Sequence, residues 1–408
     1  MRSNQQAEAI TPSPCHPPMR IALLCHYPDD DAAPTGGVWA VGRNLAAGLA
    51  AAGADVHVVR YVSAPGRGRV EISHRGEAPL TVHTVAMPRQ RTHPLRRAAA
   101  VPALVEALRS IAPEAITAHE SEYGLAALRS GYPAAVTIHG IPRQELRAFQ
   151  QWRNRLDLAL TVAQDWQMVR LARYLVAINA YALEQYAHRS RAQFFRINVP
   201  IGEVFFTQPP RPPDPHTVLM VGGMNERKDP LLLLQALAQV REAVPNVLLR
   251  IAGRQPVGSF GKRVQQVIES LHLAPHVEFL GALDQPQLAA AYSAATATVL
   301  SSRQETAPAV LMEAMAARRP VVATAVGGVA EIVAHGVSGY VTPSGDASAL
   351  AEAISTLLLD RARAAQMGAA GRALAEQNYQ RVRVGQQYLA MLRYIHQLEQ
   401  PQSAGKRP

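Results

Sequence analysis

The chain has 408 residues, of which 48% are hydrophobic and 18% are charged, a composition that is ordinary for a soluble globular protein. This length predicts two or three domains, each large enough for a hydrophobic core, and excludes a small disulfide scaffold, a collagen-like repeat and a long disordered tail. The formal charge is +10, and all but three of the 41 basic residues are arginines, which raises the question of nucleic acid or an anionic membrane surface as a partner.

The N-terminal segment 1–18 contains no apolar run of the kind that forms a signal peptide. No later stretch reaches the ~18 apolar residues of a membrane span. We therefore expect a cytoplasmic protein whose first eighteen residues are a disordered tail. Its two cysteines, Cys15 and Cys25, have neither CxxC spacing nor a neighbouring histidine cluster, so neither a disulfide framework nor a zinc site is predicted.

Short apolar runs alternate with segments of helical periodicity along the first half of the chain. The expected strands are residues 20–27, 55–61, 80–87, 114–120, 134–140, 174–180 and 193–199. Such alternation is typical of βαβ units in a parallel sheet that is buried on both faces. Residues 19–208 are therefore predicted to form one complete α/β domain.

A proline-rich segment then interrupts this alternation. Five prolines fall within residues 209–215, and because proline lacks an amide donor, a stiff interdomain linker is predicted over 209–216. A second alternation follows, with strands expected at 216–223, 246–253, 276–282, 297–302 and 320–326, and with the clearest helices at 229–243, around Met312 and at 346–359. Residues 217–380 are thus predicted to be a second Rossmann-like domain, and a last helix over 381–400 is expected to cross back to the first. Ligands of such folds bind outside the carboxyl ends of the strands, so the cleft between the two domains is the expected site.

Two glutamates mark the most informative segment, SSRQETAPAVLMEAMAARRPVVATAVGG. Glu305 follows an expected strand, and Glu313 lies eight residues later on the next helix, two turns on and therefore on nearly the same face. Two carboxylates so placed could bind the hydroxyls of one polyhydroxylated ligand; the alternative is a pair of surface glutamates that flank an amphipathic helix. Because Glu313 stands in the apolar stretch VLMEAMAA, where an unpaired carboxylate is costly to bury, the pattern favours a functional role.

Two further motifs lie in the loop after the first strand. Gly36 and Gly37 directly precede a helix, where backbone amides could approach a phosphate; a tight strand-to-helix turn is the alternative. Neither GxGxxG nor a P-loop sequence follows the strand. The aspartates at 29–31 resemble a metal-binding loop, but such a run is more often a solvated group of charges, so no metal site is predicted.

The segments VGGMNERKDP, VEFLGAL, SSRQETAPAVLMEAMAARRPVVATAVGG and HGVSGYVTPSGD resemble, in order and spacing, the signature blocks of the retaining GT-B glycosyltransferases of family 4. The resemblance covers most of residues 19–400 and is densest over 217–350. It implies a GT-B fold, with two Rossmann-like domains whose parallel sheets face each other across a cleft. The first domain would bind the acceptor, and the second the nucleotide-sugar donor.

The resemblance also implies roles for residues on the donor side. Glu305 would contact the transferred sugar and Glu313 the ribose of the nucleotide. The backbone of Thr306, Ala307 and Pro308 would bind the sugar and the phosphates. The sequence ETAP stands where many members have a glycine and a phenylalanine, which puts the usual recognition of the sugar hydroxyls in doubt.

The family's diphosphate clamp is an arginine and a lysine five residues apart. Lys228 matches the lysine, but Gly223 occupies the arginine position, and Arg227 is the candidate to compensate. Gly36 and Gly37 match the family's donor-phosphate loop.

Three residues of the first half match the family near the transferred sugar and the acceptor. His139 corresponds to a histidine that reaches the transferred sugar, and His119 and Glu120 fall on the acceptor side. For His139, a turn residue satisfied by the backbone is the alternative.

The function implied is retaining transfer of a sugar from a nucleotide-diphosphate sugar to an acceptor hydroxyl on a glycan, glycolipid or small molecule, without a metal or other cofactor. A non-catalytic GT-B module that binds a nucleotide sugar is the main alternative, supported by Gly223, and a nucleotide-sugar epimerase is a weaker one. No nucleic-acid motif accompanies the basic charge. Four arginines form the densest basic cluster, Arg89, Arg91, Arg96 and Arg97. They instead suggest peripheral association with an anionic membrane surface, on the inner face of the membrane.

Overall fold

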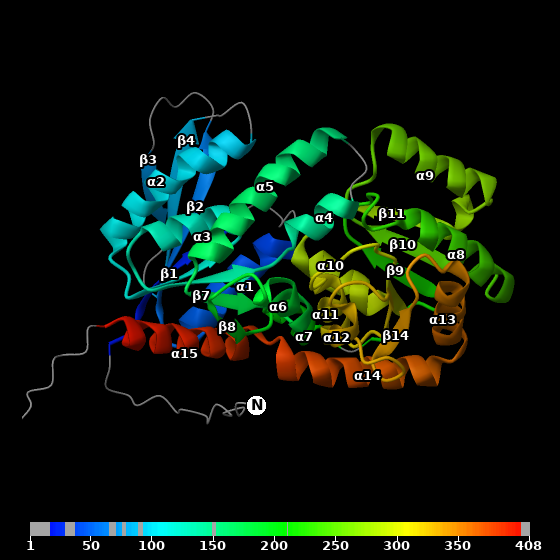
Figure 1. Cartoon of the computed structure of the whole chain (residues 1–408). Helices are drawn as coiled ribbons and strands as arrows, with labels where there is room; N and C mark the ends of the chain where they lie inside the picture. Colours follow the sequence, from blue (N-terminus) through cyan, green and yellow to red (C-terminus); the bar gives the residue numbers. More distant parts are fainter. Residues whose placement is uncertain are drawn as a thin grey trace, which may run out of the picture.

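The chain folds into two α/β domains that lie next to each other (Figure 1). This computed structural model describes residues 17–28, 37–64, 71–75, 79–88, 93–148, 152–209 and 211–400. In this part of the chain, eight strands form the sheet of the first domain and six form the sheet of the second. The α/β fold class and the two facing Rossmann-like domains expected from the sequence are confirmed.

The sheet of the first domain has the order β3-β4-β2-β1-β5-β6-β7-β8. Its strands are β1 (Arg20–Leu24), β2 (Asp55–Ala64), β3 (Glu71–Arg75), β4 (Leu80–Pro88), β5 (Ala115–His119), β6 (Ala134–Ile138), β7 (Tyr174–Ala177) and β8 (Gln193–Arg196). All pair in parallel except β3, which pairs antiparallel with β4 at the edge. The sequence prediction omitted β3 because its residues EISHR form no apolar run, and Ile72, Ser73 and His74 are exposed.

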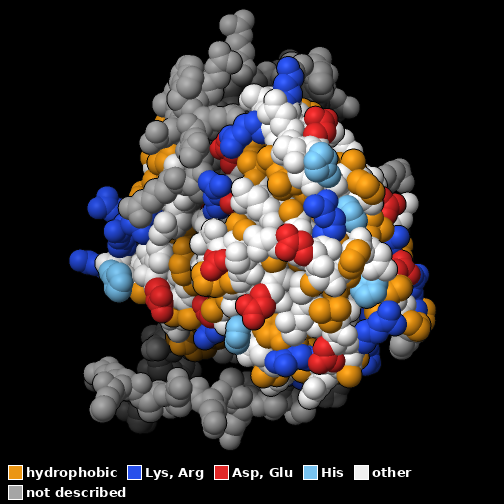
Figure 2. Space-filling model, turned by 90° about the vertical axis from the view of Figure 1, so that its right-hand side faces the viewer, with side chains coloured by type: hydrophobic (Ala, Val, Ile, Leu, Met, Phe, Trp, Pro, Cys, Tyr) orange, Lys and Arg blue, Asp and Glu red, His pale blue; other side chains and the backbone are white. Residues whose placement is uncertain are grey.

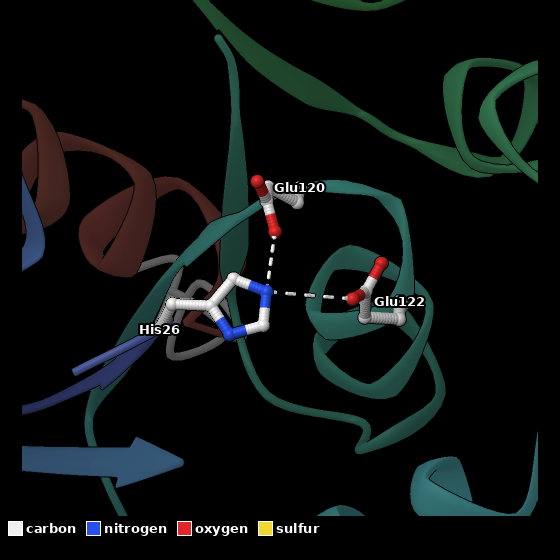
Figure 3. A group of neighbouring side chains, drawn as sticks. All are labelled: His26, Glu120 and Glu122. Carbon is white, nitrogen blue, oxygen red and sulfur yellow. Dashed lines mark ion pairs between the residues drawn. The ribbon is translucent and has the colours of Figure 1, made fainter. Parts of the chain in front are cut away.

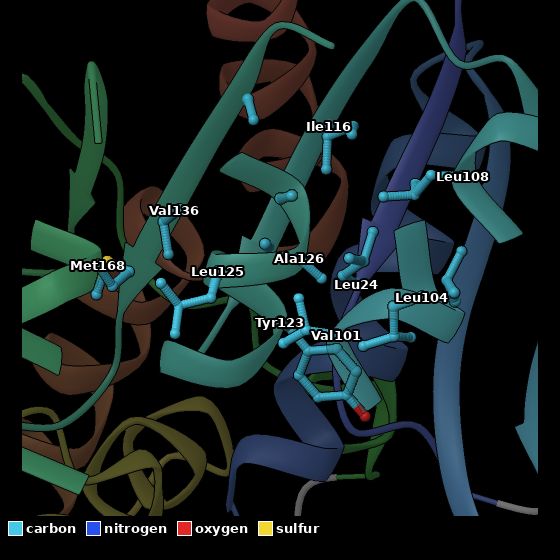
Figure 4. Close-up of a cluster of buried hydrophobic side chains, with 14 of the residues drawn as sticks. Leu24, Val101, Leu104, Leu108, Ile116, Tyr123, Leu125, Ala126, Val136 and Met168 are labelled. Atoms are coloured by element: carbon cyan, nitrogen blue, oxygen red, sulfur yellow. The ribbon is translucent and has the colours of Figure 1, made fainter. Parts of the chain in front are cut away.

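Helices cover both faces of this sheet. The helices of this domain are α1 (Gly37–Ala51), α2 (His93–Ile111), α3 (Ser121–Arg129), α4 (Pro142–Ala148), α5 (Trp152–Leu171) and α6 (Ala180–Ala187). The short helix α7 (Glu203–Thr207) follows them in the chain but packs against the second domain, where the rings of Phe205 and Tyr292 lie 5.8 Å apart. On one face, side chains of α2, α3 and α5 pack against β1, β5 and β6 (Figure 4). Leu104, Leu125 and Met168 are the helical contributions to this core, and Leu24 and Val136 come from the strands. All five are buried, as a parallel sheet covered on both faces requires.

The second sheet is parallel throughout and has the order β11-β10-β9-β12-β13-β14. Its strands are β9 (Thr217–Val221), β10 (Leu248–Ala252), β11 (Val277–Gly281), β12 (Ala297–Leu300), β13 (Val321–Thr324) and β14 (Gly339–Thr342). Its helices are α8 (Pro230–Ala243), α9 (Gly258–Ser270), α10 (Gln285–Ala294), α11 (Ala309–Ala316), α12 (Val329–Ile332), α13 (Ala347–Leu359) and α14 (Arg361–Asn378). The short strand β14 was not among the expected strands, because its residues GYVT contain only two adjacent apolar side chains and both are only partly buried.

Each sheet has one point at which the strand order reverses. In the first domain β1 lies between β2 and β5, and in the second β9 lies between β10 and β12. The connections that leave these neighbouring strands run in opposite directions, which opens a crevice at their carboxyl ends. The loops after β1, β5, β9 and β12 are therefore the places where the topology favours a ligand.

The last helix, α15 (Arg381–Glu399), leaves the second domain and packs along the first (Figure 1). Leu389 and Leu392 join the core formed by Leu45 of α1 and Leu23 of β1. The hydroxyls of Tyr388 and Thr137 lie 3.0 Å apart beneath β6. The first domain therefore completes its core with the C-terminal end of the chain.

The chain crosses between the domains at two adjacent places. The amide of Ile201 donates to the carbonyl of Tyr379 at 2.8 Å, and Ile201 and Gln380 form an isolated parallel bridge. The outward and the return crossing thus lie side by side, as a two-stranded hinge.

The described residues show no strongly one-sided charge on the face drawn in Figure 2, where basic and acidic side chains are interspersed. Arg89 and Arg91 lie outside the described residues, and so do the side chains of Arg96 and Arg97, so the predicted basic cluster stays a prediction. None of the described helices combines the length and the apolar character needed to cross a membrane.

The contact between α1 and α15 predicts a sensitive position. A Cβ on Gly48 would overlap the carbonyl of Arg381, and Gly385 of α15 lies against the Gly48 backbone. Gly48→Val should therefore push α15 away and lower the free energy of unfolding by roughly 2 kcal/mol or more, measured by urea denaturation. Ala51→Val, at an exposed position of the same helix, is the matched control. Equal stability of the two variants would contradict the packing described.

Candidate active site

A cleft of about 660 Å³ lies between the two domains. Its walls come from the loops after β1, β5 and β6 on one side and from those after β9 and β12 on the other. These include both points of reversed strand order, so the cleft lies where the topology favours a ligand.

Most of the predicted site residues meet at this cleft. The lining includes Gly37, Glu120, His139, Arg227, Lys228, Glu305, Thr306, Ala307 and Pro308. Gly223, at the position of the family's arginine, also lines it. Gly36 lies outside the described residues. His119 and Glu313 are buried and do not line the cleft.

The carboxylate of Glu305 is the centre of the polar contacts on the second-domain side of the cleft. Its Oε1 lies 2.7 Å from Nζ of Lys228 and its Oε2 lies 3.0 Å from Nη1 of Arg227. The hydroxyl of Ser302 donates to Oε1 at 2.7 Å. Burial by itself would raise the pKa of Glu305, but Lys228 and Arg227 outweigh it and the pKa lies below its usual range. Glu305 is therefore an ionised, buried acceptor of hydrogen bonds.

The loop that carries Lys228 is tied down from several sides. The amide of Lys228 donates to Oδ1 of Asn225 at 3.1 Å, and the hydroxyl of Ser301 donates to the carbonyl of Lys228 at 2.9 Å. Asp229 has left-handed backbone geometry, accepts from the amide of Leu232 at the start of α8, and forms a 2.6 Å ion pair with Arg303. These contacts hold the ammonium group of Lys228 at the cleft with little freedom to move away.

Two helices begin at the cleft, one in each domain. Helix α1 starts at Gly37 and α11 starts at Ala309, and a Cβ on Gly37 would lie 4.0 Å from the Cβ of Ala309. The N-terminal ends of helices carry unpaired amides and partial positive charge. Two such ends that face each other form a binding place for an anion such as a diphosphate.

Contacts between the domains position the Thr306 backbone. Nδ2 of Asn179 donates to the carbonyl of Thr306 at 2.6 Å, while its Oδ1 caps α6. The carboxylate of Glu331, from the second domain, accepts from the amides of Ala180 and Tyr181 at 2.7 Å each. The N-terminal end of helix α6 of the first domain is thus capped by a side chain of the second, which fixes the two domains relative to each other at this edge of the cleft.

Glu313 lies behind the cleft wall, in the core of the second domain. The hydroxyl of Tyr292 donates to its Oε2 at 2.9 Å. Burial raises the pKa of Glu313 to about 7, although Tyr292 and Lys228 act in the opposite direction. Of the two glutamates, only Glu305 lines the cleft. The pKa of Glu305 is lowered by its cations, whereas the pKa of Glu313 is raised by burial.

His139 and His119 form a stacked pair at the ends of β6 and β5. Nε2 of His139 lies 2.6 Å from Nδ1 of His119, and the ring centroids are 4.6 Å apart. Burial lowers the pKa of His139 to about 4, and burial and His139 lower that of His119 as well. Both rings are therefore neutral at pH 7, and one donates a hydrogen bond to the other. Of the two, His139 alone lines the cleft.

A histidine and two glutamates of the first domain lie close together (Figure 3). Nε2 of His26 lies 2.9 Å from Oε2 of Glu120 and 3.7 Å from Oε1 of Glu122. The three ligand atoms lie within 4.8 Å of one another. Glu120 has a positive φ of 69°, which is rare for a residue with a side chain and directs its carboxylate toward His26. The aspartates at 29–31 lie outside the described residues.

Sequence reasoning missed several residues of this site. His26 lies two residues after the end of β1, and its place in the loop after the first strand was a usable signal. Glu145 of α4 lines the cleft near Arg227 and Glu305; burial raises its pKa, and Arg227 opposes this. Asp165 of α5 also lines it, accepts from the hydroxyl of Tyr186 at 2.7 Å, and has its pKa raised by burial to about 6. Glu145 and Asp165 stand in a charged helical region whose pattern did not show which side chains face inward.

Two family models match the chain, one in each domain. The model described as "Glycosyltransferase Family 4" matches residues 35–199, and that described as "Glycosyl transferases group 1" matches residues 203–374. The two matches follow each other in the order of the two domains. The chain belongs to the GT-B glycosyltransferases of this family.

Curated relatives of this glycosyltransferase family match over part of their length. The chain is 33% identical over 174 residues to the "GDP-mannose-dependent alpha-(1-6)-phosphatidylinositol monomannoside mannosyltransferase" of Mycolicibacterium smegmatis, covering 41% of this chain and 45% of that protein. It is 36% identical over 145 residues to the "D-inositol 3-phosphate glycosyltransferase" of Corynebacterium urealyticum, covering 34% of each. The chain thus spans less than half the length of these relatives.

Solved structures match over nearly the whole chain. The sucrose-phosphate synthase of Thermosynechococcus elongatus has a TM-score of 0.74 and 23% identity, covering 93% of this chain and all of that one. The glycosyltransferase WaaG, involved in lipopolysaccharide biosynthesis, has a TM-score of 0.70 and 17% identity, covering 91% and 99%. The Anabaena protein HepE, solved with UDP and glucose, has a TM-score of 0.68 and 22% identity, covering 92% and 99%. At these identities the likeness establishes the GT-B fold.

The raised pKa of Glu313 predicts a pH-dependent stability in this glycosyltransferase. The folded protein holds the proton up to a pKa of about 7, against an ordinary value of 4.5, so stability falls as the pH rises between these values. Glu313→Gln should remove roughly 3 kcal/mol of this decline. Urea denaturation at pH 5 and pH 8 measures it, with the exposed Glu352→Gln as control. A wild-type decline in the Glu313→Gln variant would show that this carboxyl does not titrate as described.

Proposed function

We propose that this chain is a retaining glycosyltransferase that moves a sugar from a nucleotide-diphosphate sugar to an acceptor hydroxyl. The observation that carries the proposal is the cleft at which Lys228, Arg227 and the N-terminal ends of α1 and α11 converge on one side of Glu305. This arrangement presents positive charge where a diphosphate would lie and a carboxylate where sugar hydroxyls would lie. The structure of HepE was solved with UDP and glucose, which is consistent with such a donor.

The chemistry requires stabilisation of the leaving diphosphate. As the bond between the sugar and the diphosphate breaks, negative charge grows on the departing phosphate oxygen. The ammonium group of Lys228 and the amides of Gly37 and Ala309 are positioned to stabilise that charge before the reaction begins, which is the form of catalysis that usually contributes most. The departing phosphate would accept the proton of the acceptor hydroxyl on the same face of the sugar, so that the anomeric configuration is retained.

The first domain would supply contacts to the sugar and the acceptor. His139, neutral at pH 7, can hydrogen bond to a sugar hydroxyl without adding a charge. Glu120 and Glu145 line the same side of the cleft and can accept hydrogen bonds from hydroxyls. The acceptor class is proposed as a hydroxylated glycan, glycolipid or small molecule. The names of two relatives specify a phosphatidylinositol mannoside and an inositol phosphate as acceptors, both polyhydroxylated.

Independence from metal ions is part of the proposal. Lys228, Arg227 and two helix ends supply the positive charge that a divalent cation provides in other nucleotide-sugar enzymes. Transfer is expected to continue in the presence of EDTA. Loss of transfer with EDTA and its return with Mg²⁺ or Mn²⁺ would overturn this part and direct attention to His26, Glu120 and Glu122.

The proposal predicts that two buried charges are essential. Lys228→Ala and Glu305→Gln should each lower transfer by about a hundredfold or more, because each removes a charge-assisted contact aimed at the donor. A panel of UDP-, GDP- and ADP-sugars with purified protein identifies the donor and serves as the assay. Lys262→Ala, at an exposed lysine on α9, is the matched control, and circular dichroism checks the fold. Near wild-type turnover in either variant would mean that the cleft is assigned wrongly.

The replacement of the family's arginine by Gly223 predicts a rescue. No atom lies within 4 Å of a Cβ built on Gly223, so an arginine fits there. Arg227→Ala should weaken donor binding by about tenfold or more, the size of one charge-assisted hydrogen bond. Gly223→Arg in the Arg227→Ala background should restore it, measured by titration calorimetry with the nucleoside diphosphate. Failure to restore binding in a folded double variant would contradict a shared role for positions 223 and 227.

A non-catalytic module is the second candidate, and Gly223 is the observation that favours it. Tight nucleotide binding without transfer or donor hydrolysis under any acceptor would support it. An epimerase would convert the donor sugar in the absence of an acceptor, which product analysis detects.

Peripheral association with an anionic membrane is proposed for the case in which the acceptor is a glycolipid of that membrane. Co-sedimentation with phosphatidylglycerol vesicles tests it.

A further inference from the structure

Two further cavities lie at the amino ends of the strands of the second sheet, whereas the cleft lies at the carboxyl ends. These adjoining cavities of about 250 and 180 Å³ share Pro213, Arg318, Arg319 and Ala365 in their walls. Thr296 and Pro320, which line one of them, directly precede β12 and β13. The cleft lies at the carboxyl ends of these strands, so α11 begins at the cleft and ends at this second group of cavities.

Arginines dominate the charge of these walls. The lining contains Arg211, Arg318, Arg319, Arg361 and Arg372, and no aspartate or glutamate. We call this region the arginine groove. Its remaining walls are mostly prolines and alanines, including prolines of the segment 209–215 and alanines of α14, which leave the guanidinium groups as its main polar feature.

Only part of this positive charge is neutralised within the described chain. Arg211 forms a 3.0 Å ion pair with Asp214, and Arg372 forms a 2.6 Å ion pair with Glu376. Among the described residues, no carboxylate lies within ion-pair distance of Arg318, Arg319 or Arg361. The guanidinium groups of Arg318, Arg319 and Arg361, which all line the smaller cavity, therefore have no carboxylate partner in the described part of the chain.

Arg319 is partly buried in this positive surrounding. Its Nη2 donates to the carbonyl of Arg211 at 2.9 Å, while its Nε is buried without a hydrogen-bond partner. Burial and the charge of Arg211 lower the pKa of Arg319. A negative charge in the groove would offset both effects.

Arg318 occupies a backbone position that glycine fits best. It follows the end of α11 with a φ of +60°, and its amide donates to the carbonyl of Met315 at 3.0 Å. Gly368 of α14 packs against the Arg318 carbonyl, with no room for a Cβ, so the backbone cannot easily relax.

We propose that the arginine groove binds a compact anion that carries phosphate groups, at a site separate from the catalytic cleft. Guanidinium groups form paired hydrogen bonds with phosphate oxygens, and three unneutralised arginines call for a ligand with more than one negative charge. Such an anion would join Arg318 and Arg319, which follow the end of α11, to Arg361 at the start of α14.

The test is calorimetric titration of the full chain with inorganic diphosphate at constant ionic strength. Lys228→Ala is used as the background, so that binding at the cleft is weakened and the result does not depend on transfer activity. In this background, Arg318→Gly with Arg361→Ala should weaken diphosphate binding by about tenfold or more. The glycine removes the charge and relieves the backbone strain, so the variant should melt no lower than its parent.

Lys262→Ala with Arg263→Ala, which removes the same charge from exposed positions on α9, is the matched control and should bind diphosphate like the parent. Equal diphosphate binding by the Arg318 and Arg361 variant and its parent would overturn the proposal. An equal loss in the control would reduce the effect to net charge and would also overturn it. Sulfate that binds as tightly as diphosphate would overturn the assignment to phosphate groups.

Discussion

The cleft depends on one buried negative charge. The Glu305 carboxylate has little contact with solvent, and an isolated ion in that position would be strongly unfavourable. Lys228, Arg227 and Ser302 compensate for the lost hydration, and the pKa of Glu305 stays below its usual range. This requirement fixes the loops after β9 and β12 relative to each other. The cations that stabilise Glu305 are thus already in place for the phosphates of a ligand.

The rest of the site follows from topology. Parallel strands end at one edge of each sheet, and the reversal of strand order brings the first turns of α1 and α11 to face each other. The contacts of Asn179 and Glu331 across the domain boundary hold this arrangement. Because these contacts use backbone groups of the Thr306 loop and of α6, the position of the Thr306 loop depends on how the two domains are placed.

The titratable groups of the cleft are separated by their surroundings. Lys228 and Arg227 keep the pKa of Glu305 below its usual range, so Glu305 is ionised. Burial in the neighbouring core raises the pKa of Glu313 to about 7. The stacked pair of His119 and His139 is kept neutral by burial. An ionised carboxylate and a neutral histidine can both form hydrogen bonds with hydroxyl groups. In the proposed transfer, the departing phosphate would accept the proton of the acceptor hydroxyl. This distribution suits the proposed transfer without an enzymic nucleophile.

The sequence by itself determined the alternating α/β pattern, because apolar runs report burial on both faces of a parallel sheet. It also placed Glu305, Lys228 and His139 at strand ends, where periodicity gives way to loops. It did not reveal β3, whose polar residues lie at an exposed edge, nor show that Glu313 lies behind the cleft wall. The convergence of Glu305 with Lys228, 77 residues apart, and the inward position of Glu145 were decided by the tertiary structure alone. Periodicity records which face of an element is buried, whereas contacts between distant loops depend on how the two sheets are placed against each other.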